Sequence, residues 1–239
     1  MLKLIIFDFD GTIADTKEGI LETVNVTLND FGFPYTTGEK LFPLIGLPLE
    51  DIFSKVLPKN ANTDIQALTK HYRKIYNTVA SPKTKMFPGM RKTLEPLSKR
   101  GIVLAVATSK KREGVMRMLE ALGISHLFPI VLSDDLVKNK KPFPDMVESI
   151  LSKTKIEKHN ALVVGDSIYD IRMGKNAGVK TCAVTYGTGS RTELLKEKPD
   201  IVIHKISALP GAIGVERTSR FRTIYQRARK FVFKRRNRL

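Results

Sequence analysis

The sequence predicts an α/β protein with a doubly wound parallel sheet at its centre. Short apolar runs, each long enough for one buried strand, recur along the chain, and segments with helical periodicity lie between them. Such alternation is typical of a parallel sheet with helices on both faces. Hydrophobic residues make up 42% of the 239 residues, which is enough for a core of one large domain, or of one domain with an insertion.

The first strand is expected at residues 4–7, which are all apolar and followed by Asp8, Phe9, Asp10, Gly11 and Thr12. Side chains two positions apart on an extended chain share a face, so Asp8 and Asp10 should point the same way. Gly11 permits a sharp turn. Two neighbouring carboxylates repel each other unless a cation, a shared proton or a substrate lies between them. The segment therefore indicates a functional site rather than a simple charged turn.

Further strands are expected at residues 102–107, 128–132, 161–165, 179–184 and 200–203. Thr108, Ser109 and Lys110 follow the first of these, and a segment with Asp166 and Asp170 follows the third. A proline-bounded loop presents Lys140 and Lys141. Because ligands of open α/β sheets bind at the carboxyl ends of the strands, these polar groups should meet at one edge.

Residues 15–83 have mainly helical patterns and no convincing strand. Apolar side chains recur at helical spacing from Ile20 to Phe31 and again from Ile65 to Val79. The sequence therefore predicts a core formed by residues 1–14 and 84–213, a helical insertion at 15–83, and a C-terminal extension at 214–239.

These motifs, in this order, resemble those of the haloacid dehalogenase-like hydrolase superfamily, and within it the phosphoglycolate-phosphatase-like phosphatases. The resemblance covers roughly residues 1 to 213. It implies a Rossmann-like core with a small helical cap over the active site, and hydrolysis of a small phosphorylated metabolite with Mg²⁺. Phosphoglycolate is the first substrate it suggests; an inorganic pyrophosphatase or a sugar phosphomutase is the alternative. Thr12 disfavours the mutase, because the phosphoglucomutase relatives usually carry valine there, and Asp10 disfavours a dehalogenase.

The residue types suggest how such a reaction would proceed. Asp8 is the candidate nucleophile, forming an aspartyl-phosphate, and Asp10 is the candidate general acid and base. Thr108 would donate a hydrogen bond to the phosphoryl oxygens, and Lys141 would neutralise the charge of nucleophile and phosphate.

The resemblance also implies how metal and substrate are held. The Mg²⁺ ligands would be the carboxylates of Asp8 and Asp166 and the backbone carbonyl of Asp10, with Asp170 supporting the metal or orienting Lys141. Substrate contacts are expected from Thr12, Thr108, Ser109 and Gly46.

Several of these residues have structural alternatives. Thr108 could instead cap a helix over 112–122, Ser109 could also be a cap, and Asp170 could be an acid in the first turn of a helix. A lysine pair is often a solvated face, but the prolines after Lys141 favour it over Lys140. Gly46 belongs to a Gly-Leu-Pro segment that is either a turn facing the site or a helix connector.

The remaining sequence features concern the cysteine and the cellular location of the protein. Cys182 is the single cysteine and lies in an apolar run, so we expect a buried structural thiol. Asp8 and Asp10 interrupt the apolar N-terminal stretch, which disfavours a signal peptide, and no run approaches the ~18 apolar residues of a membrane span. These observations predict a cytoplasmic protein.

The C-terminal extension is strongly basic. Residues 216–239 hold ten lysines and arginines against one acid, a local charge of +9, while the net charge of the whole chain is +17. Apolar residues recur there at helical spacing. Such a segment could dock on the protein, stay solvated, lie on an anionic membrane surface or bind nucleic acid.

Overall fold

The computed structural model describes residues 1–80 and 83–215, so the predicted extension at 216–239 lies outside the described residues. A six-stranded parallel sheet forms the centre, in the order β5-β4-β1-β6-β7-β8. Its strands are β1 (Leu4–Phe7), β4 (Val103–Thr108), β5 (Ile130–Ser133), β6 (Ala161–Gly165), β7 (Lys180–Val184) and β8 (Ile201–Ile203). The predicted doubly wound α/β fold is confirmed, with strand starts shifted by at most two residues.

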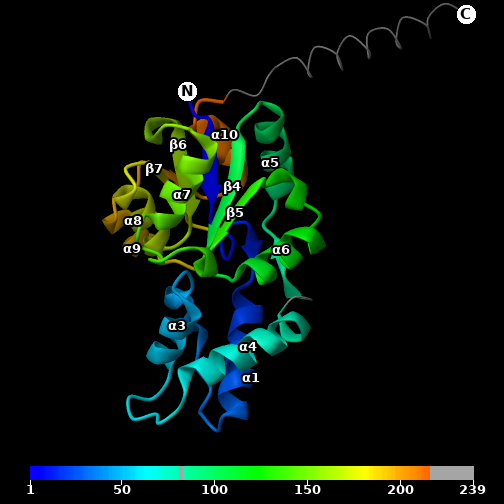
Figure 1. The fold of residues 1–239 in the computed structure, drawn as a ribbon, viewed down its shortest axis with the longest axis vertical. Helices are drawn as coiled ribbons and strands as arrows, with labels where there is room; N and C mark the ends of the chain where they lie inside the picture. The colour runs from blue at the N-terminus through cyan, green and yellow to red at the C-terminus, as the bar shows by residue number, and fades with distance from the viewer. Residues whose placement is uncertain (81–82, 216–239) are drawn as a thin grey trace, which may run out of the picture.

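Helices cover both faces of this sheet (Figure 1). They are α5 (Met90–Lys99), α6 (Arg112–Ala121), α7 (Asp145–Thr154), α8 (Ile168–Asn176), α9 (Arg191–Lys196) and α10 (Leu209–Ala212). Short 3₁₀ turns, η3 to η6, lie at Ser125–Leu127, Asp134–Leu136, Lys158–Asn160 and Ile206–Ala208.

The alternating side chains of β1 belong to two separate apolar clusters. Leu4 and Ile6 are fully buried in the cluster that includes Ile150 of α7. Ile5 and Phe7 are fully buried in the cluster that includes Leu94 of α5. Burial on both faces explains why the strand is uniformly apolar, as is typical of central parallel strands.

The chain turns to opposite sides of the sheet around β1. It passes from β1 to β4 and β5 on one side, and then to β6, β7 and β8 on the other. Such a switch point leaves room beyond the carboxyl ends of adjacent strands, where ligands bind in open α/β sheets. The helices α1 (Lys17–Asp30), α2 (Gly38–Leu41), α3 (Leu49–Val56) and α4 (Ile65–Val79), with a 3₁₀ turn η1 (Phe42–Leu44), lie beyond this edge (Figure 1).

The junction between this helical group and the core contains a feature that the sequence analysis missed. Two short strands, β2 (Ala14–Asp15) and β3 (Lys85–Met86), pair antiparallel across the entry and exit of the helical segment. The expectation of no strand within 15–83 was wrong at Asp15, because each strand is only two residues long and shows no periodicity. The division into core and cap stays a prediction.

In the described part of the chain, no helix is both long enough and apolar enough to cross a membrane. Cys182 is fully buried and unpaired, as predicted.

Candidate active site

The strand register brings the predicted motifs to one edge of the sheet. Phe7 at the end of β1 is level with Val106 of β4 and Val164 of β6. The residues that follow these strands, among them Asp8, Thr108 and Asp166, therefore lie at neighbouring strand ends. Each strand is fixed in this register by its backbone hydrogen bonds and its buried side chains.

Lys141 is the central cation of the site. Its Nζ lies 2.6 Å from Oδ1 of Asp8 and 2.6 Å from Oδ1 of Asp170, and its side chain is inaccessible to solvent. Lys140, by contrast, is partly exposed, with its Nζ 3.5 Å from Glu50 of α3. The alternative of a solvated lysine pair thus fits Lys140 and not Lys141.

Burial governs the ionisation of these groups. Burial raises the pKa of Asp8 well above its ordinary value; the nearby charge of Lys141 lowers it, but Asp170, Asp166 and Asp10 raise it further. The pKa of the Lys141 ammonium is also raised, because the attraction of Asp170 and Asp8 exceeds the cost of burial. Lys141 is therefore charged, and it lies among more carboxyl groups than one ammonium can neutralise when they ionise.

Asp166 is held by threonines. Its Oδ1 accepts a hydrogen bond from Thr12 Oγ1 (2.8 Å), and its Oδ2 accepts bonds from Thr188 N (2.7 Å) and Thr188 Oγ1 (2.8 Å). Burial raises the pKa of Asp166 to about 6, against the lowering effect of these hydrogen bonds. Thr12 was predicted to contact the substrate. The residue is fully buried, and its hydroxyl donates the hydrogen bond to Asp166.

A divalent cation would fit this group of acids. Carboxylate oxygens of Asp8, Asp166 and Asp170 all lie within 4.8 Å of one another. Oxygen ligands with excess negative charge are the donor set that Mg²⁺ prefers. Gly11, at a φ of 79°, makes room for them, because a Cβ there would lie 2.1 Å from Asp166 Oδ2. Asp170, which the sequence predicts to support the metal or to orient Lys141, is the third of these carboxylates, and the predicted ligand set stays a prediction.

Asp10 has a different environment from that of Asp8. Its Oδ1 accepts a hydrogen bond from Thr16 Oγ1 (2.7 Å) and lies 2.9 Å from Lys110 Nζ. That ammonium also lies 4.4 Å from the ring centre of Tyr76, on α4. The carboxylate of Asp10 is thereby fixed where the strand ends meet the helical group α1 to α4. From the sequence, Lys110 is predicted only to follow a strand beside Thr108; its contacts with Asp10 and Tyr76 depend on the tertiary structure.

The sequence left open whether Thr108 and Asp170 only stabilise the start of a helix, and the structure gives a different answer for each. The N-cap of α6 is Lys111, so Thr108 does not cap that helix; its Oγ1 accepts a hydrogen bond from Lys110 N (3.2 Å). The carboxylate of Asp170 makes contacts that fit both alternatives. Its Oδ2 forms a capping box with Ser167 at the start of α8, and its Oδ1 accepts a hydrogen bond from Lys141.

One contact connects the motif after β4 directly to the segment between η1 and α3. Ser109 Oγ donates a hydrogen bond of 2.6 Å to the backbone carbonyl of Gly46. Gly46 has a φ of 109°, and both residues line the pocket described next. The turn at Gly46 therefore faces the site, as one of the two sequence alternatives predicted.

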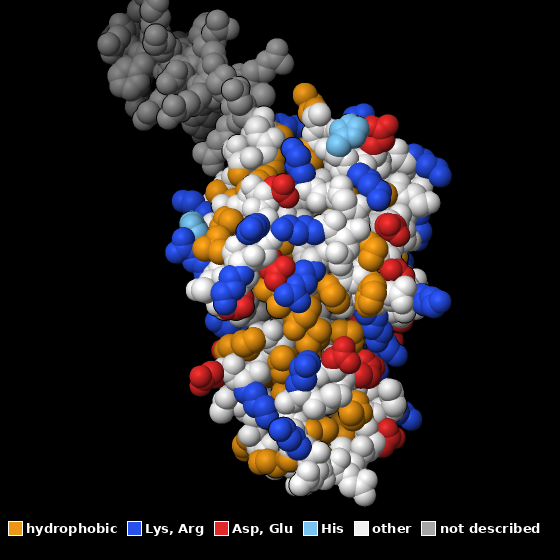
Figure 2. All heavy atoms as spheres, turned by 90° about the vertical axis from the view of Figure 1, so that its left-hand side faces the viewer, with side chains coloured by type: hydrophobic (Ala, Val, Ile, Leu, Met, Phe, Trp, Pro, Cys, Tyr) orange, Lys and Arg blue, Asp and Glu red, His pale blue; other side chains and the backbone are white. Residues whose placement is uncertain are grey.

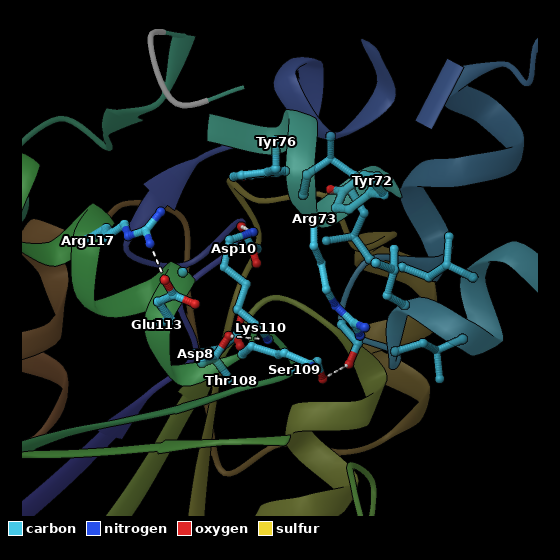
Figure 3. A pocket seen from close by; sticks show the side chains of 18 of the residues that line it. Asp8, Asp10, Tyr72, Arg73, Tyr76, Thr108, Ser109, Lys110, Glu113 and Arg117 are labelled. Carbon is cyan, nitrogen blue, oxygen red and sulfur yellow. Dashed lines mark hydrogen bonds and ion pairs between the residues drawn. The ribbon is translucent and has the colours of Figure 1, made fainter. Parts of the chain in front are cut away.

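A pocket lies between the strand ends and the helices α1, α3 and α4. Figure 3 shows Asp8, Thr108 and Ser109 at one end, with Tyr72 and Tyr76 facing them from α4 and Arg73 reaching down between. Both tyrosines lie within the segment Ile65 to Val79, for which the sequence predicts only an amphipathic helix. Their spacing of four residues, facing the carboxyl edge, is the signal that could have found them.

The comparisons with known proteins agree with this geometry. A family model described as haloacid dehalogenase-like hydrolase matches residues 5–184. The chain belongs to this family. The hydrolase is 30% identical over 216 residues to the pyrophosphatase PpaX of Halalkalibacterium halodurans, and 30% identical over 223 residues to a phosphoglycolate phosphatase of Aliivibrio fischeri. Each alignment covers 90% of this chain and 98% of the relative.

A solved structure shows the same architecture. The haloacid dehalogenase-like family protein of Streptococcus pneumoniae superposes with a TM-score of 0.79 at 26% identity, covering 88% of this hydrolase and 97% of that chain. The resemblance drawn from the motifs is thus confirmed at the level of family and fold.

Proposed function

We propose that this hydrolase is a Mg²⁺-dependent phosphatase that releases inorganic phosphate from a small phosphorylated metabolite. The observation that supports this most directly is the shared ammonium of Lys141, 2.6 Å from both Asp8 and Asp170, within a buried group of carboxylates. A carboxylate cannot approach a phosphate anion unless positive charge offsets the repulsion. Asp8 is paired with this cation and also lines the pocket.

In the proposed reaction, Asp8 attacks phosphorus and the P–O bond to the alcohol breaks, giving an aspartyl-phosphate. Asp10 gives the leaving alcohol a proton and then takes one from the water that hydrolyses this intermediate. Thr108 donates a hydrogen bond to the phosphoryl group. These roles are supported by the positions of Asp8, Asp10 and Thr108 in the pocket wall.

Asp8 and Asp166 would hold the cation, with the backbone carbonyl of Asp10 as predicted from the sequence. Asp170 would support it while anchoring Lys141. When bound, Mg²⁺ would offset the charge of the phosphoryl oxygens. Thr12 and Thr188 orient Asp166 for this purpose through three hydrogen bonds.

The names of the relatives suggest two substrates to test first. Phosphoglycolate is the candidate from the sequence resemblance and the name of one relative; pyrophosphate is the alternative, from the name of another. A sugar phosphomutase would instead isomerise a hexose phosphate without releasing phosphate.

The test is phosphate release with Mg²⁺ from a panel of phosphoglycolate, pyrophosphate, hexose phosphates, nucleotides and p-nitrophenyl phosphate. Asp8→Asn should abolish release, and acid quenching should trap a labelled phosphoryl group on the wild-type chain only. Asp51→Asn, an exposed aspartate on α3, is the matched control and should retain activity. Equal activity of Asp8→Asn and wild type would overturn the proposal.

A further inference from the structure

The wall of the pocket opposite the carboxylates is mainly apolar, with Arg73 and Asn77 of α4 among its polar side chains. Three segments of the helical group supply its aliphatic side chains: α1, the turn before α3, and α3 itself. These side chains are Ile20, Ile45, Leu47, Leu49 and Ile52. All except Leu49 are buried. On the face in Figure 2, hydrophobic side chains are visible along the junction of the core and this helical group.

Two tyrosines from α4 extend this wall. The rings of Tyr72 and Tyr76 lie 5.4 Å apart, and Tyr72 packs edge-on against Phe53 at 6.0 Å. Burial raises the pKa of both phenols well above the ordinary value, so both are uncharged. Packing on several sides fixes the rings, which lie across the pocket from Asp8, with the ring of Tyr76 facing Lys110 Nζ (Figure 3).

The cations in the wall are largely neutralised by the protein itself. Arg73 Nη2 lies 2.8 Å from Glu50 Oε1. Burial alone would raise the pKa of Glu50, but the hydrogen bond from Arg73 and the charge of Lys140 bring it below its ordinary value. Glu50 is therefore ionised and balances the charge of Arg73.

The other cations are paired or solvated. Lys110 is held by Asp10 and the face of Tyr76, and Arg117 is paired with Glu113. Lys111 is exposed at the rim, where solvent and salt screen its charge. A second anionic group on a substrate, such as a carboxylate or another phosphate, would have to share a cation that already has an acidic partner or remain at the rim.

We propose that the substrate is a phosphate monoester of an uncharged, largely apolar alcohol. This inference rests on the proposed phosphatase activity. The phosphate lies at Asp8 and Thr108, and the alcohol lies against the leucine, isoleucine and tyrosine side chains. Hydrolysis breaks the P–O bond, Asp10 protonates the departing alcohol, and water supplies the hydroxyl of inorganic phosphate. This substrate class excludes both phosphoglycolate and pyrophosphate as the preferred substrate.

The test measures kcat/KM for ethyl, butyl and hexyl phosphate beside phosphoglycolate and pyrophosphate, at fixed Mg²⁺. The alcohols of the alkyl series differ little in acidity, so any trend reports contacts with the wall. We expect kcat/KM to rise about two- to fourfold for each added methylene, since each buried methylene contributes up to ~0.8 kcal/mol. Hexyl phosphate should then exceed phosphoglycolate and pyrophosphate.

Two variants connect the trend to the wall. Leu49→Asn introduces a polar group and should flatten the rise with chain length. Leu49→Ala only shortens the side chain and should reduce the same slope. It replaces Leu49→Asn in the experiment if that variant fails to fold. Ser54→Asn changes an exposed residue of the same helix and should keep the wild-type slope.

The outcomes separate the two proposals. No hydrolysis of any ester, p-nitrophenyl phosphate included, would overturn the phosphatase itself. Hydrolysis with no dependence on chain length, or with phosphoglycolate or pyrophosphate preferred, would overturn the apolar substrate class and leave the phosphatase standing. A rising slope that Leu49→Asn leaves intact would also contradict it, since the wall would then not be its source.

Discussion

Lys141 and Asp8 are 133 residues apart in the sequence, yet the Nζ of one lies 2.6 Å from an Oδ1 of the other inside the protein. The same ammonium bonds Asp170 at 2.6 Å. A buried charge removed from such a pair leaves its partners without compensation, which is far more costly than the loss of a surface ion pair.

Replacing Lys141 by Met should lower kcat by about 10²- to 10³-fold, because the charge that offsets the approach of nucleophile and phosphate is lost. It should also lower the free energy of unfolding by about 3–5 kcal/mol. Steady-state kinetics and urea denaturation measure the two effects. Lys140→Met, on the adjacent residue, should stay within a few-fold of wild type. If both variants lose activity equally, the assignment of Lys141 as the cation that offsets the charge of nucleophile and phosphate is wrong.

Mg²⁺ should stabilise the folded protein. The buried carboxylates of Asp8, Asp166 and Asp170 repel one another, and a cation that binds only the folded state raises its stability by mass action. At a Mg²⁺ concentration of about 100 times Kd, Tm should rise by roughly 5–10 °C. Excess chelator should reverse the shift and stop turnover. Asp166→Asn should reduce the shift and Asp51→Asn should retain it; an unchanged shift in Asp166→Asn would argue against a metal at this cluster.

Asp134, in η4, should make stability depend on pH. Burial raises its pKa to about 7, even though Lys140 and Lys141 lower it, so the folded protein binds a proton that the unfolded chain, near 3.8, has released. Its ionisation therefore costs stability as pH rises from about 4 to 7, and the cost is constant above that. Between pH 5 and 8 the wild type should lose roughly 2–3 kcal/mol relative to Asp134→Asn.

Urea denaturation of both proteins at pH 5, 6.5 and 8 measures this difference. Other carboxylates titrate in both proteins, so their effects cancel in the comparison. A difference that does not change with pH would show that Asp134 is not the titrating group.

Cys182 should be inert in the native protein. The thiol is fully buried in β7, and burial raises its pKa to about 12, so little thiolate forms at pH 8. Iodoacetamide should label the native protein at less than about a hundredth of the rate seen in guanidinium chloride. Mass spectrometry of timed samples gives both rates, and rapid labelling of the native chain would contradict this burial.

The sequence by itself determined the sheet and the position of the site along the chain. Apolar runs such as residues 4–7 have few alternatives to a buried strand, and polar residues directly after them must lie at the strand ends. The two-residue strands β2 and β3 could not be predicted from the sequence, because two residues are too few to show a period.

The tertiary structure alone decided the partners of each site residue. Thr12 was expected at the substrate, but its hydroxyl donates to Asp166, 154 residues away. Lys110 lies between Asp10 and Tyr76, and Arg73 is balanced by Glu50. Local periodicity fixes which way a side chain faces within its own helix or strand. Which charge or ring it meets depends on how distant segments pack, and that is settled only when the burial of the whole core fixes strand register and helix position together.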